Sequence, residues 1–224
     1  MTPYLEDTTI ENALKTFEDF YLKKDYPNAL LTLEKNQKDL EPSLLHYNSG
    51  TVYGEMNNWP MARYHFLLAE KSGMNSKELQ QNKSLAEDKL DVSRLEQPFG
   101  TSDYLIKTAL VASEGPLVTV GLLLVVVGIW MLKKAPTFKN AVLLIVMAAT
   151  PLLLNVWINS WPKQIVTDVK IVHDGPSALF GTRGEIPAGV MVITNTKDGW
   201  EEIIYPSRFG GWVKSEAMKR LELK

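Results

Sequence analysis

Residues 116–132 have the sequence PLVTVGLLLVVVGIWML, and residues 141–157 have the sequence AVLLIVMAATPLLLNVW. Neither stretch carries a charged side chain. A helix of 17 residues rises about 25 Å, slightly less than the ~30 Å hydrocarbon core of a bilayer, and flanking lysine stems make up the difference. Two such runs, eight residues apart, favour transmembrane helices over a buried hairpin in a soluble core. The sequence therefore predicts a membrane protein with spans at 116–132 and 141–161.

The two predicted spans carry features that suit a tight helical hairpin. Gly121 and Gly128 are seven residues apart, so they share one helix face and allow the second helix to approach closely. Pro151 is expected to kink the second span, which a membrane helix tolerates when a neighbour satisfies the freed carbonyl group. Tryptophans lie at the span ends, as in an aromatic belt: Trp130, Trp157 and Trp161.

The loop at residues 133–140, KKAPTFKN, holds three lysines. Positive charge in short loops favours the cytoplasmic side. We therefore expect a multi-pass protein of the inner (cytoplasmic) membrane, with a cytoplasmic loop and both flanking domains periplasmic or otherwise extracytoplasmic. Residues 1–7 lack the basic and apolar regions of a signal peptide, which is the one feature that argues for the inverse orientation.

The N-terminal region repeats itself. The segment DYPNA at residues 25–29 recurs as NWPMA at residues 58–62, an offset of 33 residues. The second copy also contains Gly50-x2-Tyr53 and Ala62-x3-Phe66. This pattern resembles a tetratricopeptide repeat, with a generic helical bundle as the alternative. We expect residues 1–93 to be all-α, with the small Gly50 and Ala62 at a close helix contact.

A further helix is expected to cap the last repeat. Asn75-x-x-Glu78 resembles a capping box, and apolar residues then recur on one helix face, namely Leu79, Ala86 and Leu90 with Leu85 beside them. Residues 94–115 follow as a linker or juxtamembrane segment. Within this segment, residues 102–114 form either a short helix on the membrane surface or an extension of the first span.

Residues 162–224 change to a β pattern. Strands or turns are expected at 164–172 (strand), 173–177 (turn), 190–194 (strand), 197–200 (hairpin), 201–204 (strand), 210–213 (strand) and 215–221 (closing turn). This spacing predicts a small all-β barrel. The fold class is thus a multidomain membrane protein with all-α repeats, a two-helix transmembrane hairpin and a β barrel.

Four motifs follow one another in the C-terminal part: Gly175-Pro176, Ile186-Pro-Ala-Gly189, Asp198-Gly-Trp-Glu-Glu-Ile203 and Gly211-Trp-Val213. In this order they resemble a bacterial SH3-like domain. The resemblance implies binding of cell-wall peptides or of partner proteins. Trp200 and Trp212 are the candidate ligand-binding aromatics, and the alternative is that they belong to the core and rim of the barrel.

Sequence motifs for catalysis, cofactors and metals are missing. The chain has no cysteine, no P-loop and no H-E-x-x-H, and its three histidines, His46, His65 and His173, are widely spaced. His173, Asp174 and Ser177 are better explained by a turn than by a catalytic triad. Residues 1–115 hold 12 Lys/Arg and 18 Asp/Glu, which argues against nucleic acid as the partner. We expect no enzyme activity, no cofactor and no metal site.

The concave groove of the repeats is the expected protein-binding surface. Tyr47, Thr51 and Glu55 are spaced four apart on one helix face and would line it. The alternative is that they form an ordinary solvated surface.

The order of repeats, two-helix hairpin and SH3-like domain resembles the E proteins of the Bat aerotolerance operons. That resemblance implies a membrane-anchored scaffold or adaptor in a cell-envelope complex linked to aerotolerance or stress response. Its implied partners are von Willebrand A-domain membrane proteins and a MoxR-type ATPase system. The alternative function is sensing or binding of peptidoglycan through the SH3-like domain.

Overall fold

The computed structural model describes residues 4–111, 114–134 and 137–222. The chain divides into two compact units. The first consists of residues 1–97, 163–204 and 209–224, and the second of residues 98–162 and 205–208. The N-terminal helices and most of the C-terminal sheet therefore belong to the same unit, although the predicted spans separate them in sequence.

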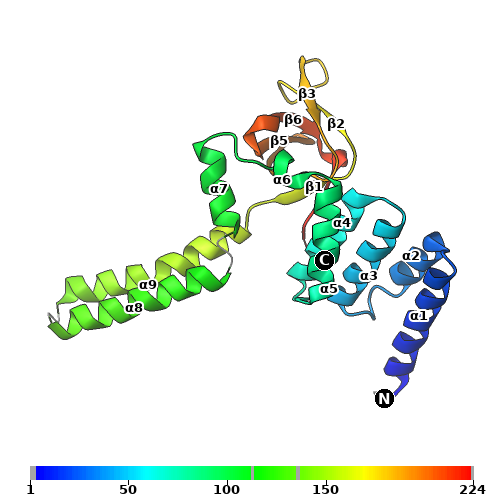
Figure 1. Cartoon of the computed structure of the whole chain (residues 1–224). Coiled ribbons are helices and arrows are strands. Elements are labelled where there is room, and N and C mark those ends of the chain that lie inside the picture. Colours follow the sequence, from blue (N-terminus) through cyan, green and yellow to red (C-terminus); the bar gives the residue numbers. More distant parts are fainter. Residues whose placement is uncertain (1–3, 112–113, 135–136, 223–224) are drawn as a thin grey trace. The chain divides into compact units, whose positions relative to one another are not determined.

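The first unit begins with helices that follow one another in series (Figure 1): α1 (Tyr4–Leu22), α2 (Tyr26–Lys35), α3 (Pro42–Glu55), α4 (Trp59–Lys71), α5 (Lys77–Lys89) and α6 (Val92–Leu95). The repeated sequence segment marks the starts of two helices, α2 and α4. Asp25 and Asn58 each cap a helix, accepting hydrogen bonds from the backbone N–H groups of Asn28 and Met61. The prediction of an all-α N-terminal region is confirmed. The capping residue of α5 is Ser76, one position after the predicted Asn75.

Helices α3 and α4 approach each other closely at Gly50. A Cβ atom added there would lie 2.6 Å from a ring carbon of Phe66 and 3.2 Å from the carbonyl oxygen of Ala62. Ala62 and Phe66 belong to a buried cluster on which Tyr53 and Trp59 pack. The predicted role of the small residues is therefore confirmed: they let the two helices touch.

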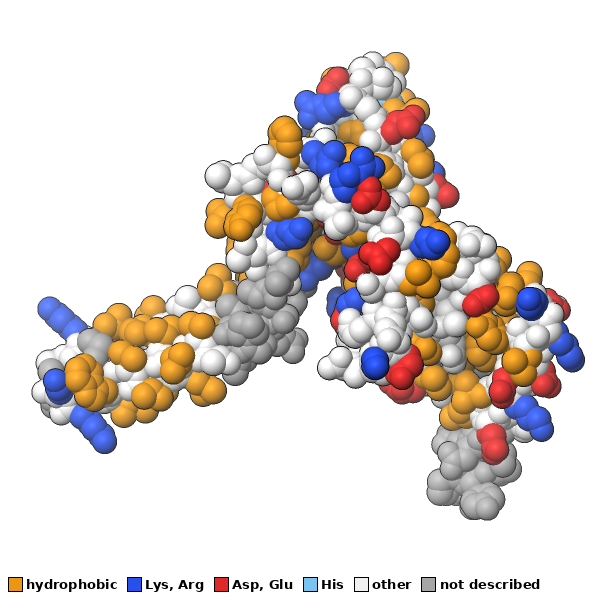
Figure 2. Space-filling view, in the orientation of Figure 1, with side chains coloured by type: hydrophobic (Ala, Val, Ile, Leu, Met, Phe, Trp, Pro, Cys, Tyr) orange, Lys and Arg blue, Asp and Glu red, His pale blue; other side chains and the backbone are white. Residues whose placement is uncertain are grey.

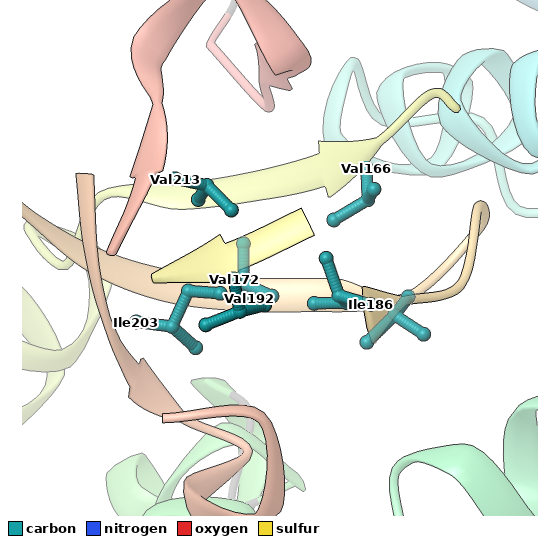
Figure 3. Packing of buried hydrophobic residues seen from close by; sticks show 7 residues of the cluster. Val166, Val172, Ile186, Val192, Ile203 and Val213 are labelled. Atoms are coloured by element: carbon teal, nitrogen blue, oxygen red, sulfur yellow. The ribbon is translucent and has the colours of Figure 1, made fainter. Parts of the chain in front are cut away.

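A seven-stranded antiparallel sheet makes up most of the rest of the first unit. Residues 205–208, at the connection between β5 and β6, belong to the second unit. The strands of the sheet are β1 (Lys163–Val166), β2 (Lys170–His173), β3 (Thr182–Ile186), β4 (Met191–Lys197), β5 (Trp200–Tyr205), β6 (Gly211–Lys214) and β7 (Met218–Arg220), with short 3-10 turns at Ser207–Phe209 and Ser215–Ala217. Their order is β3-β2-β6-β5-β4-β1-β7. Figure 3 shows buried side chains from several strands meeting in one core: Val166, Val172, Ile186, Val192, Ile203 and Val213.

The sheet departs from the sequence prediction at three places. The run 164–172 is not one strand, because it breaks between Val166 and Lys170 and its halves pair with different neighbours. Strand β3 was not predicted, since its exposed glycine and charged residues hide any alternation. The last segment contains strand β7 as well as a turn. The hairpin at Asp198–Gly199 is confirmed, and both residues have positive φ.

A buried arginine joins the helices to the sheet. Arg63 on α4 is 3% exposed. Its Nη1 donates hydrogen bonds to Glu96 Oε1 and to the carbonyl oxygen of Gly189, both at 2.6 Å, and its Nη2 donates to Glu96 Oε2 at 3.2 Å. The same Glu96 carboxylate accepts a hydrogen bond from the Met191 backbone N–H at 2.7 Å. The Arg63–Glu96 pair thus binds two backbone groups before and at the start of strand β4, the Gly189 carbonyl and the Met191 N–H.

An apolar contact extends this junction. Leu68 of α4 forms a buried cluster with Ile165 of β1 and with Leu221. Beside it, Lys71 Nζ donates a 2.7 Å hydrogen bond to the carbonyl oxygen of Leu221. A helix of the repeats therefore covers Ile165 and Leu221, and the repeats and the sheet share this apolar cluster.

The second unit contains α7 (Thr101–Val111), α8 (Glu114–Lys134) and α9 (Phe138–Asn159). Helices α8 and α9 form the predicted hairpin (Figure 1). A Cβ atom added at Gly121 would contact the Pro151 side chain at 3.5 Å, and one added at Gly128 would overlap Leu144. The predicted close approach at both glycines is confirmed. The segment expected at 102–114 contains the separate helix α7, and residues 112–113 lie outside the described residues.

In the described part of the chain, one helix is long and apolar enough to cross a membrane, the 21-residue stretch Phe138–Ile158. It includes most of the predicted second span. The predicted first span lies in α8, where the side chains of residues 116–118 and 131 lie outside the described residues. Figure 2 shows hydrophobic side chains over the surface of the α8–α9 hairpin and basic ones at its tip. Those basic residues are the exposed Lys133, Lys134 and Lys139.

Replacing Arg63 by alanine should strongly destabilise the first unit. The change removes the buried guanidinium that pairs with Glu96 and Glu87, and breaking a buried ion pair from one side costs about 3–5 kcal/mol. The free energy of unfolding is measured by urea titration of the full chain in detergent. Arg94→Ala, which breaks the exposed pair with Asp91, is the matched control and should cost about 0–1 kcal/mol. Equal costs for the two variants would contradict the role assigned to Arg63.

Candidate functional site

A groove of about 320 Å³ lies on one face of the repeats. Its lining comes from three helices and the turn between two of them: Thr51, Gly54 and Glu55 of α3, Asn57, Trp59 and Phe66 at and within α4, and Asn82 and Leu85 of α5. The groove therefore spans the α3–α4 pair and the helix that follows it.

Two of the three predicted groove residues line this groove and one does not. Thr51 and Glu55 are in the lining. Tyr47 lies beside it, where its ring packs 6.2 Å from the ring of Phe66 and its hydroxyl accepts a hydrogen bond from Asn82 Nδ2 at 3.3 Å. Tyr47 therefore supports the groove wall instead of offering a free binding group.

Glu55 makes one edge of the groove acidic. Its side chain is exposed, and it accepts a 3.4 Å hydrogen bond from the Tyr26 hydroxyl. Burial and the nearby Glu55 carboxylate raise the pKa of Tyr21. The tyrosines around Glu55 thus stay neutral donors at neutral pH, and the carboxylate has no cation paired with it in the described hydrogen bonds and ion pairs.

Another part of the lining is apolar and carries an amide. Leu85, which the sequence pattern placed beside the buried face of α5, is 46% exposed. Trp59 is half-buried, and Lys89 Nζ lies 5.9 Å from the centre of its ring. Together with Asn82, these side chains can take an apolar residue and hydrogen-bond a polypeptide backbone. The repeat pattern alone did not identify Asn82 or Leu85, because they come from the next helix.

The two candidate tryptophans of the sheet lie on one outward face. Trp212 pairs with Glu202 and with His173, and Trp200 pairs with Lys214. Residues opposite one another share a face, and side chains alternate along a strand. Glu201, Ile203 and Val213 therefore occupy the opposite, buried face. The tryptophans are half-buried on the face of the sheet opposite its buried core.

His173 belongs to this outward face. Its ring meets Trp200 edge-on, with ring centres 5.5 Å apart. Asp174 pairs with Arg183, and the Ser177 hydroxyl accepts a hydrogen bond from the Leu179 N–H. Each of the three side chains has its own partner, which agrees with the predicted turn.

A second pocket, of about 480 Å³, contains a histidine pair that the sequence spacing did not reveal. The Nδ1 atoms of His46 and His65 are 3.2 Å apart. The pair joins α3 to α4, so the histidines expected to be widely separated are neighbours in space. In the described residues, no group of three His, Cys, Asp or Glu side chains could hold a metal ion.

No family model, curated protein or solved structure matches this chain. The resemblances to tetratricopeptide repeats, to SH3-like domains and to the Bat operon proteins therefore rest on the motifs quoted above.

Proposed function

We propose that this protein is a membrane-anchored scaffold without catalytic activity of its own, and that its repeat groove binds a polypeptide segment of a partner. The observation that carries the proposal is the groove itself. It combines the exposed carboxylate of Glu55 with the amide of Asn82 and the exposed apolar surface of Leu85.

This lining defines the chemistry of the ligand. A basic side chain would pair with Glu55, and an apolar side chain would lie between Trp59 and Leu85. The acidic charge of residues 1–115 favours the approach of a basic segment. The Bat operon resemblance adds a class of partner, the von Willebrand A-domain membrane proteins of the same envelope complex.

The hairpin is the proposed anchor. Exposed apolar residues cover both helices, including Leu122, Leu123 and Ile129 on α8 and Ile145, Leu153 and Val156 on α9. A contiguous apolar surface of this extent is expected to face lipid or a partner. Residues before and after the hairpin share one compact unit, and one folded unit cannot lie on both sides of a membrane. If α9 crosses the bilayer, α8 must cross it as well.

Changing the groove should abolish partner capture without unfolding the repeats. The double variant Thr51→Ala and Glu55→Lys removes a groove hydroxyl and reverses the charge at its edge. We expect at least tenfold less partner in pull-downs from solubilised membranes, or about 1.4 kcal/mol, with stability changed by about 0.5 kcal/mol or less. Asp168→Lys, an exposed site outside the groove, makes the same charge reversal as a control. Unchanged capture by the double variant would assign binding elsewhere.

A second function, binding of cell-wall material, is favoured by the tryptophan face. Trp200, Trp212 and His173 form an outward aromatic surface of a kind that stacks on flat or sugar-like ligands. It is separate from the groove, so the two functions can be tested independently.

The wall-binding function is tested by co-sedimentation of the detergent-solubilised full chain with purified peptidoglycan. We expect Trp200→Ala and Trp212→Ala each to lower the sedimented fraction severalfold, since stacking on an aromatic ring is worth about 0.5–1.5 kcal/mol. Leu179→Ala, at a side chain that is 97% exposed, serves as the control. Wild-type sedimentation by both tryptophan variants would reject wall binding and leave the scaffold function intact.

The orientation is a further part of the proposal. We propose that the loop is cytoplasmic and that the repeats and sheet are outside, because positive charge in short loops favours the cytoplasmic side. Single cysteines can be introduced at Ser102, Lys134 and Glu216, which are all exposed, because the chain contains no cysteine. In intact cells, a membrane-impermeant maleimide should label positions 102 and 216 only. Labelling at position 134 alone would show the inverse orientation.

A further inference from the structure

A buried carboxylate fixes helix α7 within its own unit. Asp103 is 0% exposed, and its carboxylate accepts hydrogen bonds from the Ser207 backbone N–H at 3.1 Å and from the Ser207 hydroxyl at 2.9 Å. The same carboxylate accepts a 3.1 Å hydrogen bond from the Phe99 N–H. Hydrogen bonds to a charged group are stronger than neutral ones. One side of α7 is therefore held against residues 205–208, which belong to the same unit.

The rest of the α7 surface is apolar and aromatic. Tyr104 is 69% exposed and Leu105 is 72% exposed, and Phe99, two residues before the helix, is 80% exposed. The exposed side chains of α7 are all uncharged: Thr101, Ser102, Tyr104, Leu105 and Thr108. Large apolar side chains gathered in one short segment mark a surface that another molecule is expected to cover.

The chain places this surface close to the proposed membrane anchor. Helix α7 ends at Val111 and α8 begins at Glu114, so three Cα–Cα steps, at most about 11 Å, separate the two helix ends. The headgroup region of a bilayer is about 5–8 Å thick on each side. If α8 crosses the bilayer, the end of α7 therefore lies in the headgroup region or directly beside it.

The residue types on this surface suit that position. Tyrosine is enriched at membrane–water interfaces, because its ring is apolar while its hydroxyl can stay hydrated. The two charged residues of α7 do not oppose the contact: Asp103 is buried on the side held by Ser207, and Lys107 is half-buried. A helix with an apolar face can thus lie in the plane of the interface without burying a charge among lipids.

We propose that α7 is an interfacial helix, with Phe99, Tyr104 and Leu105 inserted among the lipid headgroups of the leaflet from which α8 enters. This inference rests on the proposed membrane anchor and adds a second lipid contact to it. Through the hydrogen bonds of Asp103, the interfacial helix holds the β5–β6 connection at Ser207 at a fixed height above that leaflet.

The test uses the full chain in phospholipid vesicles, with single cysteines that carry an environment-sensitive fluorophore. Tyr104→Cys and Ser102→Cys form a matched pair, because residues two apart on a helix are about 200° apart around its axis. Both sites are exposed, so neither change should disturb folding. We expect lipids spin-labelled in the headgroup region to quench position 104 severalfold more than aqueous iodide does, and position 102 to show the reverse.

A third position separates this inference from the anchor on which it rests. Ile145 is exposed on α9, and a fluorophore at Ile145→Cys should be quenched by lipids labelled deep in the acyl chains. If position 145 responds to lipid but position 104 responds only to iodide, the anchor stands and the interfacial helix is rejected. Protection of position 104 from both quenchers would also reject it, because protein would then cover α7. A lack of lipid quenching at position 145 would reject the anchor itself, and this inference with it.

Discussion

A buried guanidinium group sets the constraint on which the rest of this structure depends. Arg63 can be buried because Glu96 and Glu87 neutralise it and the Gly189 carbonyl accepts another of its hydrogen bonds. Glu96 and Gly189 lie 33 and 126 residues away in sequence, on either side of the predicted spans. The repeats and the sheet are consequently one folded body, and the chain between them must leave and return on the same side of any membrane.

Features encoded by short-range pattern could be predicted from the sequence. The repeated segments at 25–29 and 58–62 and the turn at Asp198–Gly199 depend on residues within a few positions of one another. The contact of Gly50 with Ala62 and Phe66 joins two neighbouring helices of one repeat. Strand β3 could not be predicted, because most of its side chains are exposed and its glycine weakens the strand signal. The contact of Arg63 with Gly189 could not be predicted either, since no local pattern links two positions so far apart.

The candidate sites show the same division. Thr51 and Glu55 follow from helix spacing within α3, whereas Asn82 and Leu85 required the packing of α5. The histidine pair is an intermediate case. His46 and His65 lie at similar distances before and after the turn at Asn57, so a predicted antiparallel hairpin already places them at about the same height. That comparison, rather than the spacing of histidines along the chain, is the signal that would have found them.

The long sequence separation at Arg63 also imposes an order in time. A ribosome adds about 5–20 residues per second, so the Gly189 carbonyl is made some 6–25 s after the Arg63 side chain that binds it. During that interval, the repeats can fold and pair Arg63 with Glu96, but one face of the pair stays open to water. The sheet closes that face only when both helices of the hairpin have been synthesised. A chain that stops early therefore keeps a hydrated charge and an uncovered Leu68, which distinguishes it from a finished one.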